Sequence, residues 1–274
     1  MTFSIAAQVG DAFGVAVASK FPFVGAVVPE VRLGVGAVAT QAMARVSYRG
    51  TALAALAEGL DASVAVEACT TPDEAREHRQ LGVVGVDAQA TFTGAECMDW
   101  AGGVCGRESS GGYAIQGNIL TGPEVVEAME SAWLGSAGAS LTDRLIATLL
   151  AGDEAGGDSR GRQGAALYAV APGAGYDGCG VLADVRVDDH PDAPRELARL
   201  LRVNDLLFGR PEDVQPLTGA LAEEVSARLA RLGHGGDDVA EALERWAGEA
   251  NYEMRMTPDG IDAKVLAALR EETA

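Results

Sequence analysis

The chain opens with residues 1–20, MTFSIAAQVGDAFGVAVASK, and this stretch predicts the hairpin around which the rest of the fold is built. Residues 2–9 and 13–20 are short apolar runs of the length of a strand. The Gly-Asp-Ala segment between them is a turn signal of the kind that joins two antiparallel strands. In such a hairpin, the end of the second strand lies beside the start of the first.

Thr2 lies at the tip of the first strand, directly after the initiator methionine. A side chain this small favours removal of Met1 in the cell, which leaves a free α-amine beside the threonine hydroxyl. That amine can act as the base for its own hydroxyl, as in N-terminal nucleophiles. Ser19 or Lys20, at the end of the second strand, can reach Thr2, and Lys20 could lower the pKa of the amine or donate to the hydroxyl. A solvated surface lysine is the alternative.

The composition limits the classes of function. With 274 residues and 48% hydrophobic side chains, the chain is long enough for one large domain and one small domain. A net charge of −19 argues against a nucleic-acid partner, which requires clustered lysine and arginine. The four cysteines form no C-x-x-C pair, and we predict neither a metal site nor a cofactor. The sequence shows neither a secretion signal nor an apolar run long enough to span a membrane, so we expect a cytoplasmic protein without a membrane partner.

Strand patterns and helix pairs alternate beyond the hairpin. We expect strands over 33–39, 81–86, 90–95, 113–118, 165–170 and 181–187, and helices over 50–69, 121–134, 140–151 and 192–204. A further helix is expected to begin at Thr71-Pro72, and residues 96–112 are expected to form a loop that lines a site. This order does not suit a doubly wound parallel sheet. It favours an α+β fold in which two largely antiparallel sheets pack together, with helices on both outer faces.

The character of the sequence changes after Phe208. Residues 209–213 are polar and contain glycine and proline, which is typical of a joint between domains. Helical patterns follow, without a convincing strand. We therefore predict a first domain over residues 1–208 and a small helical module over residues 209–274.

Two segments offer hydrogen-bond donors for the oxyanion that forms when an amide is attacked. The small-residue segment at 33–41 could supply backbone N–H groups near Thr40 and Gln41. Asn118 follows a strand and could donate from its side chain. The alternatives are close packing of the sheet for the glycines and capping of a turn for Asn118.

The loop at 157–163, GDSRGRQ, places two arginines in an acidic chain. The planar guanidinium suits a carboxylate or a ureido-like group, so Arg160 or Arg162 could hold an anionic end of a substrate. Asp158 could orient an arginine or accept a hydrogen bond from the N-terminal amine. The alternative is an Asp–Arg network that only supports the loop. The loop lacks the Gly-Lys-Ser/Thr of a phosphate-binding loop.

Asp188, Asp189 and His190 form another polar cluster near the end of an expected strand. Carboxylates and imidazole suit several divalent ions, so a metal-dependent hydrolase is one interpretation of this cluster. The chain has only three histidines and no H-x-x-x-H spacing. This interpretation is therefore the weakest of those that the sequence allows.

Several of these segments resemble the family called domain of unknown function 1028. They are MTFSIA at 1–6, GVAVASKF at 14–21, VGAVATQA at 35–42, FTGA at 92–95, YAIQGNIL at 113–120, GGDSRGRQ at 156–163 and RVDDHP at 186–191. The resemblance runs from residue 1 to residue 208 or nearby, and departs at Gly164, where the family pattern favours serine. The family is grouped with the N-terminal nucleophile (Ntn) hydrolases, so the resemblance implies a four-layer αββα sandwich. It also implies hydrolysis of an amide by an N-terminal Thr, Ser or Cys.

The tail resembles a peptidoglycan-binding-like module that is appended to some members of that family. The resemblance is carried by Trp246, by Asn251-Tyr252-Glu253 and by Asp259-Gly260-Ile261-Asp262. Because we expect a cytoplasmic protein, a role in dimerisation or as a lid fits better than binding to peptidoglycan. We expect a homodimer.

Together, the residues and the resemblance predict an Ntn-type amidohydrolase that acts on a small-molecule amide after removal of Met1. The predicted catalytic residues are Thr2, Lys20 and Asn118, and the predicted oxyanion- or substrate-binding residues are Thr40, Gln41, Asp158, Arg160 and Arg162. The competing interpretation is a non-catalytic binding or assembly protein that has the same fold. Nothing in the sequence identifies the substrate.

Overall fold

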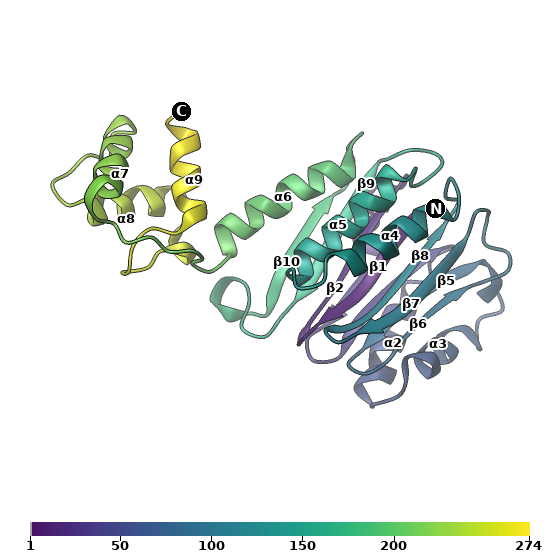
Figure 1. Cartoon of the computed structure of the whole chain (residues 1–274). Coiled ribbons are helices and arrows are strands. Elements are labelled where there is room, and N and C mark those ends of the chain that lie inside the picture. The colour runs from purple at the N-terminus through teal and green to yellow at the C-terminus, as the bar shows by residue number, and fades with distance from the viewer. Residues whose placement is uncertain (1) are drawn as a thin grey trace. The chain divides into compact units, whose positions relative to one another are not determined.

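In the computed structural model, which describes residues 2–274, the chain forms two compact units (Figure 1). The first unit ends at Leu200 and the second runs from Leu201 to Ala274. Helix α6 (Ala193–Phe208) passes through this division, and the boundary predicted after residue 208 falls at the end of the same helix.

The first unit contains two antiparallel sheets, which form the mixed α and β fold class that the sequence predicted. The larger sheet has the order β10-β9-β2-β1-β8-β7, and the smaller has the order β3-β4-β5-β6. The strands of the larger sheet are β1 (Thr2–Val9), β2 (Ala12–Ser19), β7 (Gly102–Glu108), β8 (Gly111–Asn118), β9 (Gly164–Val170) and β10 (Val181–Val187). The strands of the smaller sheet are β3 (Pro29–Arg32), β4 (Gly36–Ala42), β5 (Arg79–Gly85) and β6 (Gln89–Thr93).

The N-terminal hairpin is confirmed and lies at the centre of the larger sheet. Its register pairs Phe3 with Ala18 and Val9 with Ala12, and each of the two strands has 8 residues. On its other side, β1 pairs antiparallel with β8, where Thr2 lies opposite Asn118. The start of β1 therefore lies between the ends of β2 and β8, which are distant from each other in the sequence.

Helices cover the outer face of each sheet (Figure 1). The larger sheet carries α4 (Glu124–Gly135) and α5 (Leu141–Glu154), and the smaller carries α2 (Ser47–Ala57) and α3 (Ala62–Thr70). The inner faces of the sheets pack on each other, mainly through β1 and β8 against β4 and β5. The order of layers is helix, sheet, sheet, helix. A short helix, α1 (Val24–Val27), and the 3-10 turns η1 (Arg76–His78) and η2 (Tyr176–Gly178) lie in connections.

The layer between the sheets is divided into an apolar part and a polar part. Successive residues of a strand point to opposite faces, so alternate residues of each strand enter this layer. Its apolar part includes Ala6, Val15, Val17, Ala39 and Ala114. Toward the start of β1, the positions that continue this alternation carry hydroxyl and amide side chains. They are Thr2, Ser4, Ser19, Gln41, Gln80, Gln116 and Asn118, each at most 5% exposed.

Two local predictions were wrong. Residues 96–112 are not a loop, because they contain the edge strand β7. This strand pairs only with β8 and its residues alternate between half-buried and exposed, so its sequence lacks the apolar run that marks a buried strand. The helix expected at Thr71-Pro72 is replaced by turns and by η1, because the Asp73 carboxylate accepts hydrogen bonds from Tyr48 and Arg79. The short strand β3 was not predicted from the sequence.

The second unit is helical, as the sequence predicted. Its elements after α6 are α7 (Gly219–Arg231), α8 (Val239–Glu249), the 3-10 turn η3 (Glu253–Arg255) and α9 (Ala263–Glu272). Asp238 and Asp262 cap α8 and α9 by accepting hydrogen bonds from the backbone of the first turn. Trp246 packs in the core of this unit, with its ring centre 5.4 Å from that of Tyr252.

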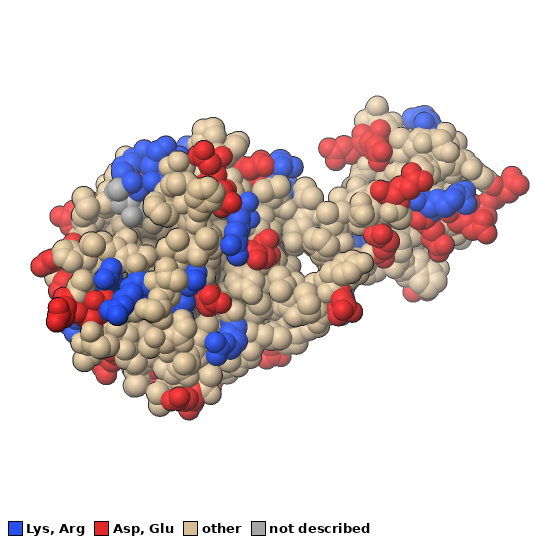
Figure 2. All heavy atoms as spheres, turned by 180° about the vertical axis from the view of Figure 1, so that it is seen from behind, with Lys and Arg blue, Asp and Glu red and all other residues tan. Residues whose placement is uncertain are grey.

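Acidic and basic side chains are interspersed over the face of the molecule that Figure 2 shows. Within residues 2–274, no helix has the length and apolar character needed to cross a membrane.

Candidate functional site

Thr2 is the first residue of β1 and is only 5% exposed. Its Oγ1 atom lies 3.1 Å from Oγ of Ser19, the last residue of β2, and either hydroxyl can be the donor. This contact follows from the hairpin, because antiparallel pairing brings the end of β2 to the start of β1. Ser19 is thus one of the two residues that the sequence predicted to reach Thr2. Met1, whose removal the predicted chemistry requires, lies outside the described residues.

Three buried amide side chains surround the backbone carbonyl of Thr2. Gln41 Nε2 donates to this carbonyl oxygen at 3.2 Å and to Gln80 Oε1 at 2.7 Å. Asn118 Nδ2 donates to the same two acceptors, at 3.4 Å and 3.0 Å. The amides come from β4, β5 and β8, so both sheets hold the first residue of β1 in place. Two of the predicted site residues, Gln41 and Asn118, are thereby brought together with Thr2.

The buried polar layer continues at Ser4, the next residue of β1 that faces the other sheet. Ser4 donates to Gln41 Oε1 at 2.6 Å and accepts from Gln116 Nε2 at 2.6 Å. Gln80 Nε2 donates to the carbonyl oxygen of Gly117 at 2.7 Å. The side chains of this network are neutral, and their mutual hydrogen bonds offset the cost of removing polar groups from water.

Gln80 was not among the residues predicted from the sequence, and no role was predicted for Gln116. Each is a glutamine within an otherwise apolar strand, at a position that alternation turns toward the other sheet. That alternation was a usable signal, because a long polar side chain at an inward position requires buried partners.

Lys20 and Thr40 make their described contacts elsewhere in the fold. Lys20 is exposed, and its Nζ donates to the carbonyl oxygen of Arg162 at 3.1 Å. Thr40 is buried, and its backbone N–H donates to the carbonyl oxygen of Val28 at 3.1 Å. Its hydroxyl donates to the carbonyl oxygen of Arg45 at 3.4 Å. The backbone N–H of Thr40 is therefore used within the fold.

Asp158 and Arg160 form a closed pair in the loop before β9. Arg160 Nε donates to Asp158 Oδ1 at 3.2 Å, and Arg160 Nη2 donates to Asp158 Oδ2 at 2.9 Å. The buried Asp158 carboxylate also accepts the backbone N–H of Lys20 at 2.7 Å. The pair therefore joins this loop to the end of β2, as expected of a supporting Asp–Arg network.

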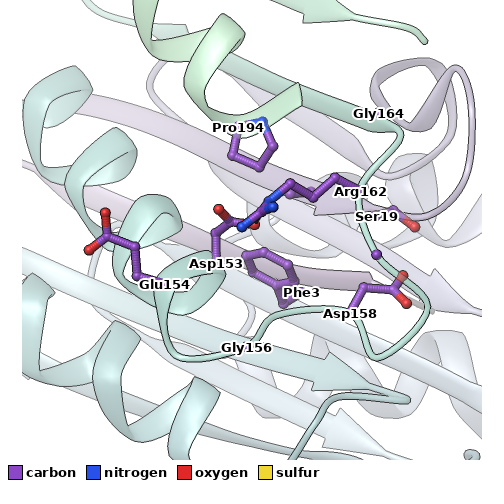
Figure 3. Close-up of a pocket in the computed structure, with 11 residues that line it drawn as sticks. Phe3, Ser19, Asp153, Glu154, Gly156, Asp158, Arg162, Gly164 and Pro194 are labelled. Carbon is purple, nitrogen blue, oxygen red and sulfur yellow. Dashed lines mark hydrogen bonds and ion pairs between the residues drawn. The ribbon is translucent and has the colours of Figure 1, made fainter. Parts of the chain in front are cut away.

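Arg162 is placed differently, because it lines a pocket of about 260 Å³ (Figure 3). Its Nε donates to Asp153 Oδ1 at 2.6 Å, and this hydrogen bond raises the pKa of the guanidinium. Phe3 also lines the pocket, below Arg162 and Asp153 in the view of Figure 3. Ser19 belongs to the lining too, so the pocket adjoins the residue that contacts the Thr2 hydroxyl.

The Asp188-Asp189-His190 segment is held by other hydrogen bonds. Asp189 Oδ1 accepts from Gln163 Nε2 at 3.2 Å, and His190 Nδ1 accepts the backbone N–H of Asp192 at 3.1 Å. Across residues 2–274, no group of three or more His, Cys, Asp or Glu side chains is arranged to hold a metal ion.

Comparisons with known proteins agree with this division of the chain. The model of a "Family of unknown function (DUF1028)" matches residues 2–197, and the model of a "Putative peptidoglycan binding domain" matches residues 206–269. The chain is also similar to the crystal structure of protein SPO2555 from Silicibacter pomeroyi, which carries the DUF1028 label. That match has a TM-score of 0.65 and 28% sequence identity, and covers 81% of this chain and 92% of the other. No curated protein matches the chain.

Proposed function

The chain belongs to the DUF1028 family, and we propose that its first unit is an amidohydrolase of the Ntn class that cleaves a small amide. The layer order of helix, sheet, sheet, helix supports this proposal, because it is the order of the αββα sandwich that the family resemblance implies. The single observation that carries the proposal is the placement of Thr2. It begins a central strand, with its hydroxyl 3.1 Å from Ser19 Oγ and its carbonyl held by two buried amides.

The proposed reaction begins once Met1 has been removed. The free α-amine takes the proton of the Thr2 hydroxyl while Oγ1 forms a bond to the carbonyl carbon of the substrate amide. The tetrahedral intermediate then breaks its C–N bond, the proton passes to the leaving nitrogen, and an ester remains on Thr2. Water attacks this ester, which restores the hydroxyl and releases a carboxylic acid.

The neighbours of Thr2 have assignable roles in this reaction. Ser19 orients the Thr2 hydroxyl, because the two oxygen atoms lie within hydrogen-bond distance. Asn118 is the proposed donor to the oxyanion and would exchange its 3.4 Å hydrogen bond to the Thr2 carbonyl for one to the oxyanion. Gln41 fixes the carbonyl of Thr2, so that the amine and the hydroxyl keep their orientation. Lys20 is proposed to act on the amine through its charge, from the end of β2.

The first experiment is the intact mass of protein purified from cells. The proposal requires the loss of Met1, and a chain that retains methionine quantitatively excludes this mechanism. The second experiment is a panel of small amides, followed by ammonia or amine release. We expect Thr2→Ala to abolish hydrolysis and Thr2→Ser to retain it, because serine keeps a hydroxyl on the N-terminal residue. Thr51→Ala is the matched control, since Thr51 is exposed on α2. Equal turnover by Thr2→Ala and the parent protein would falsify the nucleophile assignment.

One observation favours the competing function, a binding protein on the same fold. Thr2 is 5% exposed and is not among the residues that line the 260 Å³ pocket. In that case, the pocket would hold a ligand that is released unchanged. Saturable binding of an amide, with the amide recovered intact after prolonged incubation with Met1-free protein, would support this function and exclude hydrolysis of that compound.

A further inference from the structure

Asp153 carries a buried oxygen atom that the fold does not satisfy. The residue lies near the end of α5 and is 5% exposed. Its Oδ1 accepts a hydrogen bond from Arg162 Nε, whereas its Oδ2 has no hydrogen-bond partner among residues 2–274. Buried polar atoms are almost always paired in folded proteins, so an unpaired one next to a pocket points to a missing ligand. Asp153 lines the 260 Å³ pocket.

Arg162 supplies the complementary group. Its side chain is 42% exposed, and in Figure 3 its guanidinium lies next to the Asp153 carboxylate. The ion pairs of Arg162 with Asp153 and Asp192 both use Nε, at 2.6 Å and 3.8 Å. The two terminal nitrogens therefore keep their N–H donors for a ligand. Arg160 is not equivalent, because Asp158 already binds both its Nε and its Nη2.

The charges around the pocket exclude a simple anion as the best ligand. Asp153, Glu154 and Asp158 face one arginine, Arg162, in the lining. The ion pair with Arg160 neutralises the Asp158 carboxylate, but the carboxylates of Asp153 and Glu154 still outnumber the single guanidinium of Arg162 in the lining. A ligand that brings only negative charge would be repelled, and one that brings a positive charge as well would be attracted. The volume of about 260 Å³ lies below the roughly 300–1,000 Å³ of sites for drug-sized ligands, which indicates a small ligand.

We propose that this pocket binds the zwitterionic head group of a small α-amino acid that carries an amide. The carboxylate of the ligand would accept hydrogen bonds from the terminal nitrogens of Arg162, and its ammonium would donate to Asp153 Oδ2. The inference rests on the proposed function only for the fate of the amide. Ser19 lines the same pocket and contacts the Thr2 hydroxyl, so the amide end would extend toward Thr2.

Binding is measured by calorimetry on the full chain that carries Thr2→Ala, so that no turnover disturbs the titration. The two test ligands are L-glutamine and L-asparagine. Three modified ligands are compared with them: N-acetyl-L-glutamine lacks the ammonium, L-glutaminamide lacks the carboxylate, and butyramide lacks both. We expect at least one of the two amino acids to bind, and each modified ligand to bind about tenfold more weakly or not at all. Butyramide binding as tightly as the amino acids, or neither amino acid binding, overturns the proposal.

Two variants test the roles of Asp153 and Arg162 by measuring which ligands the pocket prefers. Asp153→Asn should remove the preference for L-glutamine over N-acetyl-L-glutamine, and Arg162→Gln should remove the preference over L-glutaminamide. Asp11→Asn and Arg32→Gln are matched controls at exposed positions outside the pocket lining, and should keep the parent preferences. Unchanged preferences in both test variants exclude these two residues as the head-group site.

Failure of this inference and failure of the proposed function give different results. Binding of L-glutamine by the parent protein, with no hydrolysis of any amide, excludes the amidohydrolase and leaves the head-group site intact. Hydrolysis of butyramide, with no binding of either amino acid, supports the amidohydrolase and excludes the head-group site.

Discussion

Gln80 is the residue on which the buried polar contacts of the first unit converge. Its Nε2 donates to Thr93, Gly102 and Gly117, and its Oε1 accepts from Gln41 and Asn118. Because Gln80 is fully buried, water cannot replace any of these contacts. The position of Thr2 depends on this residue indirectly, since the two amides that hold the Thr2 carbonyl are themselves bound by Gln80.

Replacing Gln80 with leucine should therefore destabilise the first unit. The substitution leaves the amide donors of Gln41 and Asn118 without their shared acceptor, and a buried unpaired polar group costs about 1–3 kcal/mol. We expect a loss of about 3 kcal/mol in the free energy of unfolding, measured by urea denaturation. Gln163→Leu is the matched control, because its hydrogen bond to Asp189 is exposed, and it should change the stability by less than about 0.5 kcal/mol. Equal stability of the two variants would contradict this account of the network.

The candidate site shows which residue-level predictions a sequence can support. The Thr2–Ser19 contact follows from local information, since a tight hairpin fixes which residues face each other. The contacts of Lys20 could not be predicted in the same way. They depend on a loop that lies about 140 residues further along the chain, and on which carbonyl oxygen that loop presents. The pairing of Arg160 with Asp158 was one of two alternatives, and residue type alone could not decide between them.

At the scale of elements, the close approach of the two sheets depends on a glycine in β5. A Cβ atom on Gly82 would lie 2.2 Å from Gln116 Oε1 and 2.7 Å from its Cδ. Gln116 cannot move aside freely, because it is fully buried and its Nε2 is bound to Ser4. The glycine therefore gives the amide network the space between β5 and β8.

We expect Gly82→Ala to separate the sheets locally and to lower the free energy of unfolding by about 1–3 kcal/mol. Gly50→Ala is the control, because Gly50 lies within α2 and an added Cβ would meet no atom within 4 Å. That control should stabilise the protein by about 0.5–1 kcal/mol, through the better helix propensity of alanine. Urea denaturation of both variants gives the two values, and a stabilising effect at Gly82 would be incompatible with the close contact to Gln116.

The elements that were predicted correctly carry their signal within a few residues. The hairpin has its turn between two apolar runs, and Ser140 caps α5 because its side chain accepts the backbone N–H of Asp143. The edge strand β7 was harder to predict from the sequence, because alternate residues of it contact solvent and it contains several glycines. The pairing of β1 with β8 was out of reach, since it joins residues more than 100 positions apart and depends on the packing of the whole unit.

At the scale of the whole molecule, the chain has a net charge of −19, and several of its carboxylates take part in short ion-pair networks. The second unit gives the clearest case. Arg255 is fully buried and donates to Asp262 Oδ2 at 3.1 Å and to Asp205 Oδ1 at 3.0 Å. Glu224 binds Arg228 and Arg270, which belong to two different helices. In their ionised form, these carboxylates help to hold the elements of this unit together.

The stability of the second unit should therefore fall in acid. Burial alone would raise the pKa of Asp262, but hydrogen bonds from backbone N–H groups and the charge of Arg255 outweigh it and lower the pKa. Hydrogen bonds from Arg270 and Arg228 lower the pKa of Glu224 to about 2. A carboxylate whose pKa is lower in the folded state stabilises the fold above its unfolded pKa of about 4, and loses this contribution as the pH falls through the folded value. We expect a steady stability from pH 7 to about 5 and a decline between about pH 5 and 2.

Amide hydrogen exchange in residues 219–272, corrected for the intrinsic rate at each pH, measures this decline in the second unit separately from the first. Asp262→Asn tests the cause. It should destabilise the unit near neutral pH, because asparagine cannot offer Arg255 a charge, and it should flatten the acid decline, because one of the shifted carboxylates is gone. Asp237→Asn is the matched control at an exposed position, and should leave the pH profile unchanged. A profile that is flat in the parent chain, or equally steep with Asp262→Asn, would show that the buried Arg255–Asp262 pair does not set the acid stability of this unit.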